Sequence, residues 1–205
     1  MIPGTTGYAE RASELVARYE SISFCAKHKA ILHLLPTVPS SIIDIGAASG
    51  TDAAWLAAHG HQVVAVEPVD EFRLAGIALH PSSAIEWIND SLPTLAQLSH
   101  CDRQFDVVLI SAVWMHLDAT ERTLAMQSVA SLIASTGTFI MSLRHGPLPT
   151  DRRMFDVSSE ATISLAHTCG LRPIFNARAQ SIQAANRTAG VTWTHLAFQR
   201  DHSAR

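Results

Sequence analysis

Five short apolar runs alternate with helix-like stretches between residues 41 and 143, and this alternation constrains the fold more than any other feature of the sequence. Four of the five runs are rich in Val and Ile and almost continuously apolar. Strands of that kind are covered on both faces, as in a parallel sheet. We therefore expect a doubly wound α/β sheet with crossover helices. The expected strands are 41–46, 62–66, 84–88, 105–110 and 138–143, and the expected helices are 52–59, 70–79, 92–98 and 119–134.

The two ends of the chain depart from this alternation. Helical patterns at 8–19 and 24–35 precede the first strand. After the fifth strand we expect a helix at 158–169, with Ser158 or Ser159 as its N-cap and Gly170 at its end. Two strands, 172–177 and 192–199, then form a hairpin-like pair that places one antiparallel strand in the sheet. We expect a single domain over 1–205, with a helical cap at 1–38 and a Rossmann-like core at 39–205.

The distribution of charge argues against a generic nucleic-acid binder. The chain has 15 Lys and Arg against 18 Asp and Glu, a net charge of −3, whereas such binders are usually basic throughout. Residues 1–136 hold 7 basic and 14 acidic side chains, and residues 137–205 hold 8 basic and 4 acidic ones. The last third is therefore expected to present a local positive surface on an acidic body.

Cysteines, histidines and apolar runs indicate the cellular compartment and argue against disulfides, a metal site and a membrane span. Three dispersed cysteines form neither a disulfide framework nor a metal site, which favours a reducing cytoplasm. The eleven histidines show no metal-binding spacing, so we assign no metal. The opening residues, MIPGTT, lack the basic and apolar regions of a secretory signal, and no apolar run approaches the ~18 residues of a transmembrane helix. We expect no membrane partner.

A glycine-containing loop follows the first expected strand, at the edge of the sheet where open α/β folds bind ligands. Its order is D-x-G-x-A-x-G, carried by Asp44, Gly46, Ala48 and Gly50. The loop lacks the lysine of a P-loop, the GxSxG of a nucleophile elbow and the glycine spacing of a dinucleotide fingerprint. The sequence therefore excludes three common ligand motifs at this position.

Acidic residues at successive strand ends favour a cationic nucleoside as the ligand. A carboxylate at Asp44 would repel a pyrophosphate, whereas S-adenosylmethionine has no phosphate and carries an ammonium and a sulfonium. Glu67 ends the second strand about 20 residues after the loop, where a carboxylate can accept hydrogen bonds from both ribose hydroxyls. Asp90 follows the third strand and can accept from an adenine amino group.

These residues carry a resemblance to a known family. The run IIDIGAASGTDAAWLAAHGHQVVAVEP at 42–68, with NDSLP and FDVVLISAVWMHL after it, resembles the class I S-adenosylmethionine-dependent methyltransferases. The resemblance implies an α/β, Rossmann-like, doubly wound sheet of seven strands, mostly parallel with an antiparallel last strand and with helices on both faces. It also implies S-adenosyl-L-methionine as cofactor and S-adenosyl-L-homocysteine as product.

The resemblance also implies a set of cofactor-binding positions. Ala48 stands where the family usually has glycine, and its methyl group is tolerable if φ stays negative. The residues implied to bind the cofactor are Asp44, Gly46, Ala48, Gly50, Asp52, Glu67, Pro68, Asn89, Asp90, Ser91, Ser111, Ala112 and Val113.

Three residues after the fourth and fifth strands are candidates for catalysis. His116 can take a proton from an acceptor near neutral pH, or is simply a loop histidine. Arg144 and His145, with Arg152 and Arg153 in the same loop, form the densest positive patch of the chain. An arginine fork binds carboxylate or phosphate, so we suspect an anionic acceptor; the alternative is a loop salt-bridged to nearby Asp151 or Asp156. Tyr8 and Tyr19 are candidates for a lid, or simply pack.

The sequence thus predicts a cytoplasmic enzyme, monomeric or homodimeric, that methylates a small molecule and has no nucleic-acid partner. Two alternatives stay open. One is an RNA or protein methyltransferase, which the positive last third supports. The other is a non-catalytic S-adenosylmethionine-binding regulatory protein, because a fold does not fix a function.

Overall fold

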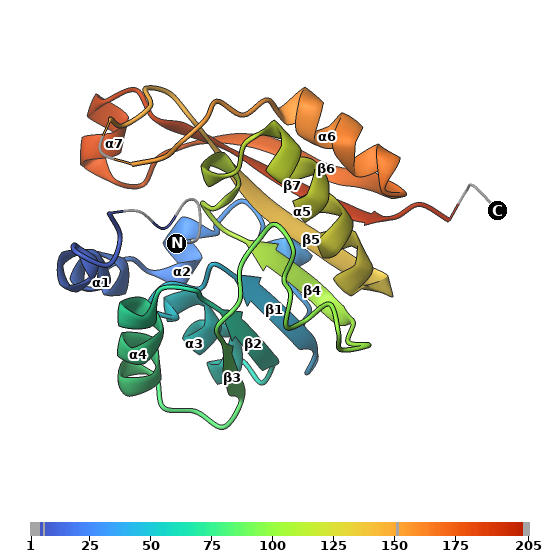
Figure 1. Cartoon of the computed structure of the whole chain (residues 1–205), viewed down its shortest axis with the longest axis horizontal. Coiled ribbons are helices and arrows are strands. Elements are labelled where there is room, and N and C mark those ends of the chain that lie inside the picture. Colours follow the sequence, from blue (N-terminus) through green and yellow to red (C-terminus); the bar gives the residue numbers. More distant parts are fainter. Residues whose placement is uncertain (1–4, 6, 151, 203–205) are drawn as a thin grey trace.

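A mixed β-sheet forms the centre of this computed structural model (Figure 1). The structure describes residues 5, 7–150 and 152–202, and within these residues the sheet has seven strands in the order β3-β2-β1-β4-β5-β7-β6. β7 pairs antiparallel with both β5 and β6, and the other pairs are parallel. The strands are β1 (Ser41–Ile45), β2 (Gln62–Val66), β3 (Ile85–Ile88), β4 (Phe105–Ile110), β5 (Ile133–His145), β6 (Leu171–Gln180) and β7 (Thr192–Arg200).

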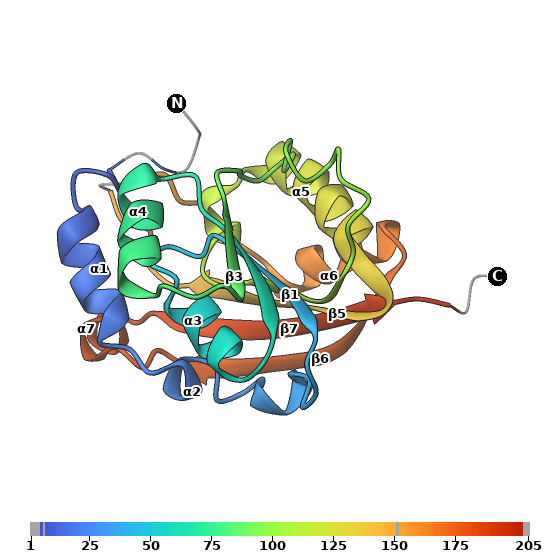
Figure 2. The same cartoon turned by 90° about the horizontal axis from the view of Figure 1, so that it is seen from below.

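Helices cover both faces of the sheet, which is why its central strands are almost continuously apolar. Ile42 and Val63 pack on one face with Leu56 of α3, while the adjacent Ile43 and Val64 pack on the other with α5. Figure 2 shows α2 and α3 on one side of the sheet and α5 on the other. The helices are α1 (Ala12–Glu20), α2 (Phe24–Lys27), α3 (Thr51–Ala58), α4 (Asp70–Leu79), α5 (Ala119–Leu132), α6 (Ser159–Thr168) and α7 (Ala184–Thr188), with 3-10 turns η1 (Leu32–Leu34) and η2 (Trp114–His116).

The predicted fold class is confirmed, including the antiparallel strand contributed by the last pair. The predicted helix over 70–79 is α4, and Ser158 is the N-cap of α6 because its side chain accepts from the N–H of Ala161. α5 begins with a capping box between Asp118 and Glu121. The predicted hairpin does form, but its connection contains the short helix α7.

The predicted helix over 92–98 is wrong. This segment forms turns in which Leu95 has a positive φ of 48°. The carboxylate of Asp90 accepts the N–H groups of Ser91, Gln97 and Leu98, and it thereby ties both ends of the segment together. The apolar spacing that suggested a helix instead reflects the burial of leucines in the core.

The predicted helix over 24–35 is also interrupted. α2 ends at Lys27, and after an irregular stretch a 3-10 turn follows at Leu32–Leu34. The interruption brings Lys27 and His28 to the same oxygen of Asp52 on α3. Ile31, between the two elements, is fully buried against the sheet.

α1 packs against α4 at the edge of the molecule, as both views show (Figures 1 and 2). Leu15 of α1 lies in a small apolar cluster with Val69 and Phe72. This cluster holds the N-terminal segment beside the carboxyl ends of the strands. Residues 1–4 and 6, within the opening stretch MIPGTT, lie outside the described residues. No helix within 5, 7–150 and 152–202 is both long and apolar enough to cross a membrane.

Trp87 on β3 lies across two glycines that have no room for a side chain. A Cβ at Gly76 of α4 would lie 2.3 Å from the indole of Trp87 and 2.9 Å from the carbonyl oxygen of Ser49. A Cβ at Gly50 would lie 2.6 Å from the same indole. The indole therefore packs α4 and the glycine loop together, and both glycines are needed for that close approach.

We predict that Gly76→Ala destabilises the protein, although alanine is the better helix former by about 1 kcal/mol. The added methyl group must displace the Trp87 indole and meets the Ser49 carbonyl, so a loss of about 1–3 kcal/mol in the free energy of unfolding is expected. Urea denaturation measures it, with the exposed Glu71→Ala on the same helix as a control expected to stay within about 0.5 kcal/mol of wild type. A variant as stable as wild type would contradict this account of the packing.

Candidate active site

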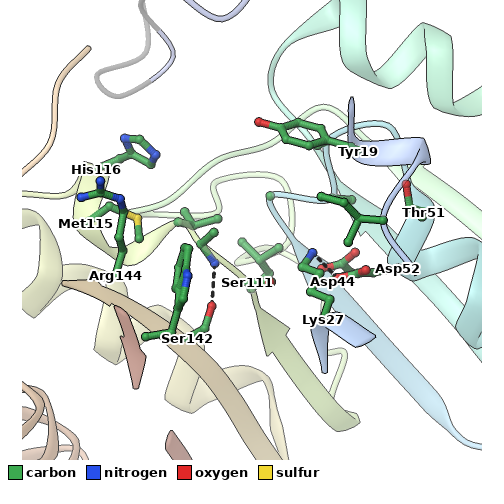
Figure 3. A pocket seen from close by; sticks show the side chains of 18 of the residues that line it. Tyr19, Lys27, Asp44, Thr51, Asp52, Ser111, Met115, His116, Ser142 and Arg144 are labelled. Atoms are coloured by element: carbon green, nitrogen blue, oxygen red, sulfur yellow. Dashed lines mark hydrogen bonds and ion pairs between the residues drawn. The ribbon is translucent and has the colours of Figure 1, made fainter. Parts of the chain in front are cut away.

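A cavity of about 850 Å³ opens at the carboxyl ends of β1, β2, β4 and β5, where doubly wound sheets bind their ligands. Figure 3 shows Lys27, Asp44 and Asp52 gathered at one end of it. His116, Met115 and Arg144 lie at the other end, and Ser111 and Ser142 lie between the two groups. The cavity thus has an acidic end and a basic end.

The glycine loop after β1 is held in a left-handed turn. Gly46 has φ +81°, and a Cβ there would lie 2.4 Å from Cγ2 of Val113. Ala48 has φ +50°, so the expectation that its φ stays negative is wrong. An alanine in this region costs roughly 1–2 kcal/mol, which the N–H of Ala48 helps to offset by donating to Glu67. Gly50 does not line the cavity; it faces Trp87 instead.

Asp44 is a buried carboxyl at the end of β1 that is only partly satisfied. Its residue is 2% exposed, and Oδ2 has no hydrogen-bond partner among the described residues. Burial, reinforced by the nearby charge of Asp52, raises the pKa of Asp44 to about 8. Asp44 lines the cavity, and a buried carboxyl group with an unpaired oxygen is suited to a cationic partner, since a cation would supply the compensating charge. The ammonium group of S-adenosylmethionine fits this requirement.

Asp52 has a different role from the one that the sequence suggested. Its Oδ2 accepts from Nζ of Lys27 at 2.8 Å and lies 2.7 Å from Nε2 of His28. Burial alone would raise the pKa of Asp52. Lys27 and His28 lower it by more, so the pKa of Asp52 lies well below its ordinary value. Asp52 lines the cavity, but the ammonium of Lys27 balances its charge. Sequence reasoning missed Lys27 and His28, because nothing local links them to a residue 25 and 24 positions away.

Glu67 joins the end of β2 to the glycine loop. Its Oε1 accepts from the N–H of Val69 at 2.8 Å, and its Oε2 accepts from the N–H of Ala48 at 2.9 Å. Burial raises the pKa of Glu67 to about 7, and those two N–H groups oppose the shift. Each carboxylate oxygen keeps further capacity to accept a hydrogen bond. Glu67 and the adjacent Pro68 line the cavity, as the sequence predicted.

The segment after β3 contributes two of its three predicted residues. Asp90 and Ser91 line the cavity, whereas Asn89 does not. The carbonyl oxygen of Asn89 accepts from the side-chain amide of Gln97 at 2.6 Å, on the surface. Asp90 is largely engaged by backbone N–H groups, so it shapes this wall of the cavity and keeps little capacity for a ligand.

The segment after β4 lines the middle of the cavity with Ser111, Ala112 and Val113, as predicted. Ala112 has φ +60°, and its N–H donates to Oγ of Ser142 at 2.9 Å (Figure 3). Ser142 on β5 therefore holds this bend and lines the cavity itself. No local sequence pattern marks this contact between residues 30 positions apart.

His116 lies at the basic end of the cavity and is 8% exposed. Its Nδ1 lies 2.8 Å from the carbonyl oxygen of Arg153, and its Nε2 lies 3.1 Å from the hydroxyl of Tyr8. Burial is the main cause that lowers the pKa of His116, and the positive charges of Arg152, Arg153 and Arg144 lower it further. His116 is therefore a neutral imidazole near pH 7.

The predicted arginine patch separates into two parts. Arg153 is paired with Asp118 at 3.0 Å and Glu121 at 2.7 Å, and these residues differ from the expected Asp156. Asp151, the other expected partner, lies outside the described residues. Arg144 and Arg152 line the cavity. Arg144 donates to the carbonyl oxygen of Pro147, and Arg152 lies 5.7 Å from the ring centroid of Tyr8.

His145 does not line the cavity, although its neighbour Arg144 does. Successive side chains of a strand point to opposite faces, so both residues of this pair on β5 cannot face the same cavity. The ring Nε2 of His145 lies 2.8 Å from Oγ1 of Thr194 on β7 instead.

Tyr8 and Tyr19 both line the cavity and both pack against Phe72, with ring centroids 6.1 and 6.0 Å from it. The packing is therefore observed, and the role of the two tyrosines as a lid stays a prediction. Within the described ranges, no group of three His, Cys, Asp or Glu side chains is arranged to hold a metal ion.

Comparisons with known proteins agree with this site. The family model of the methyltransferase domain matches residues 43–141, which span the glycine loop, both acidic strand ends and the middle of the cavity. Residues 43–141 match a methyltransferase domain, and the chain has the fold of class I S-adenosylmethionine-dependent methyltransferases. The prediction of S-adenosylmethionine as cofactor is supported by solved structures of the same fold that hold its demethylated product, S-adenosylhomocysteine. No curated protein matches the sequence of this chain.

Solved structures share the fold of this chain at low sequence identity. The 1,6-didemethyltoxoflavin-N1-methyltransferase of Burkholderia thailandensis, bound to 1,6-didemethyltoxoflavin and S-adenosylhomocysteine, has a TM-score of 0.74 at 18% identity, over 95% of this chain and 85% of that chain. N-methyltransferase NodS of Bradyrhizobium japonicum, in complex with S-adenosylhomocysteine, has a TM-score of 0.67 at 16% identity, over 93% and 98%. A chain from the Haloferax volcanii complex of the Trm112 methyltransferase activator with a methyltransferase has a TM-score of 0.72 at 14% identity, over 96% and 99%.

We predict that binding of S-adenosylhomocysteine releases protons from Asp44 at pH 7. The raised pKa leaves much of this carboxyl protonated in the free protein, whereas a bound ammonium favours the ionised form. Calorimetry at pH 7 in two buffers of different ionisation enthalpy counts the protons released. Asp44→Asn is expected to weaken binding at least tenfold and to reduce the proton release, whereas the exposed Asp70→Asn leaves both unchanged. Equal proton release from Asp44→Asn and wild type would place the cation elsewhere.

Proposed function

We propose that this chain is a methyltransferase that transfers a methyl group to a small anionic molecule held at the basic end of the cavity. The observation that carries the proposal is the change of charge along one cavity, from Asp44 at one end to Arg144 at the other (Figure 3). A volume of about 850 Å³ is within the range of sites that hold small molecules.

At the acidic end, we assign the cofactor's contacts from the free capacity of each group. Asp44 would bind the ammonium with its carboxylate, and Glu67 would accept from the ribose hydroxyls with the lone pairs that Val69 and Ala48 leave free. Ser91 and the adjacent Asp90 would flank the adenine. When bound, the cofactor supplies an electrophilic methyl group.

At the basic end, Arg144 is the group that would bind the anionic acceptor. It lines the cavity, and one N–H of its guanidinium already donates to the carbonyl of Pro147, which fixes the direction of the fork. Met115 and Trp193 line the same cavity with apolar surface, which limits the access of water. Orientation of the acceptor by such contacts accounts for a large part of the rate in reactions of this kind.

The N-terminal segment would act as a cap over this cavity. The described part of residues 1–38 contributes Tyr8, Tyr19 and Lys27 to the lining, and its packing on Phe72 holds it beside the strand ends. Residues 39–205 would form the core that carries both binding ends. We infer a cytoplasmic location from the free cysteines, of which Cys25 and Cys101 are exposed.

A screen with isotope-labelled S-adenosylmethionine tests the proposal. Pools of small anionic metabolites, total RNA and protein extract are offered to the full chain in parallel, and the label is expected in the small-molecule pool. Label in RNA or protein alone would replace the small-molecule reading with a macromolecular acceptor. No transfer to any pool, with the cofactor still bound, would favour a regulatory protein.

We predict that Arg144→Gln raises the KM for the acceptor found by the screen about 10- to 100-fold, because it removes a charge-assisted hydrogen bond. The affinity for S-adenosylhomocysteine should change less than twofold, since Arg144 lies at the other end of the cavity. Steady-state kinetics and calorimetry measure the two quantities. Arg172→Gln, a surface change on β6, is the control and leaves both unaltered. A larger effect on cofactor binding than on KM would remove the anion site.

A further inference from the structure

Tyr8 and His116 form a contact across 108 residues that methyl-donor binding does not explain. The phenolic oxygen lies 3.1 Å from Nε2 of the imidazole, and the two rings meet edge to face with centroids 5.6 Å apart. Both side chains line the basic end of the cavity. The phenol ring is held from its other side by Phe72, so the hydroxyl is fixed in place.

The direction of the hydrogen bonds follows from the partners. The carbonyl oxygen of Arg153 can only accept, so Nδ1 of His116 carries the proton and donates to it. Nε2 therefore has a lone pair, and the hydroxyl of Tyr8 donates to it. Arg152 is also hydrogen-bonded to the phenolic oxygen, which leaves one lone pair that can accept a proton from a molecule in the cavity. The pair is thus arranged as a chain of two proton acceptors.

The positive charges of nearby arginines determine how readily His116 accepts a proton. Arg144 on β5 and Arg152 in the following loop act on His116 together with Arg153, whose own charge is balanced by Asp118 and Glu121. Without an anion, these guanidinium groups disfavour an imidazolium. An anionic acceptor between Arg144 and Arg152 would offset that positive potential and make protonation of the imidazole easier.

We propose that Tyr8 and His116 are a proton relay, and that the acceptor is an O–H or N–H acid carrying an anionic group; this rests on the proposed function. The proton of the acceptor passes to Oη of Tyr8 as the phenolic proton passes to Nε2 of His116. The electron pair left on the acceptor atom forms the new bond to the methyl carbon, and the pair of the broken carbon–sulfur bond stays with sulfur. Solvent later removes the proton from His116.

A coloured phenol that carries a carboxylate tests the relay without methyl transfer. The probe is 4-hydroxy-3-nitrobenzoate, added to the full chain saturated with S-adenosylhomocysteine at a pH where the free probe is mostly protonated. The absorbance of its phenolate reports the ionised fraction. Wild type is expected to hold about ten times more bound phenolate, relative to bound phenol, than Tyr8→Phe or His116→Gln. Glu14→Gln, an exposed change on α1, should match wild type.

Outcomes that overturn the proposal are equally clear. Equal ionisation of the bound probe in wild type, Tyr8→Phe and His116→Gln would remove the relay. Absence of probe binding to wild type would remove the proposed class of acceptor. Calorimetric binding of S-adenosylhomocysteine shows that each variant is folded.

The tautomer of His116 gives a second test on the unaltered protein. Nitrogen-15 spectra of the histidine side chains, assigned with His116→Gln, should show the proton on Nδ1 and a hydrogen-bonded lone pair on Nε2. A proton on Nε2 would overturn the relay whatever the variants do. The proposed function fails separately, when the labelled-methyl screen finds only RNA or protein as acceptor.

Discussion

The carboxyl group of Asp44 is the constraint on which the site depends. It is buried beside a second acid, Asp52, which is paired with Lys27 and contacts His28. Oδ2 of Asp44, in contrast, has no hydrogen-bond partner within the described residues. A buried carboxyl left in this state destabilises the folded protein unless a cation binds or the group stays protonated. The cavity in front of it therefore favours a cationic ligand, and the chemistry of that ligand determines the reaction.

The same cavity separates two tasks by charge. The acidic end is built from groups at the tips of β1 and β2, and the basic end is built from β5, the loop after it and the N-terminal segment. Ser142 joins the two ends by holding the bend at Ala112. An electropositive methyl donor and an electronegative acceptor would thus be drawn to opposite ends of one enclosed space, with their reacting atoms between them.

Sequence patterns predicted the parts of the site that depend on strand ends. The carboxyl ends of parallel strands lie at one edge of a sheet, so the sequence predicts that Asp44, Gly46 and Glu67 lie close together. The structure places all three in the lining of one cavity at that edge. The contacts of Tyr8 with His116 and of Lys27 with Asp52 join distant segments, so no local pattern marks them. The prediction of a helix over 92–98 is wrong for a related reason. The apolar spacing of this segment reflects burial, while hydrogen bonds to the carboxylate of Asp90 determine its backbone conformation.

Two small residues of the glycine loop have structural roles that the sequence alone did not indicate. Gly50 serves the packing of Trp87, whereas Ala48 tolerates a left-handed backbone and lies within reach of Glu67. We propose that Asp44 binds the ammonium of a sulfur nucleoside. A crystal structure with S-adenosylhomocysteine tests this most directly, and the amino nitrogen is expected at hydrogen-bond distance from the carboxylate of Asp44. A nucleoside bound with its amino group elsewhere, or a diphosphate in its place, would contradict it.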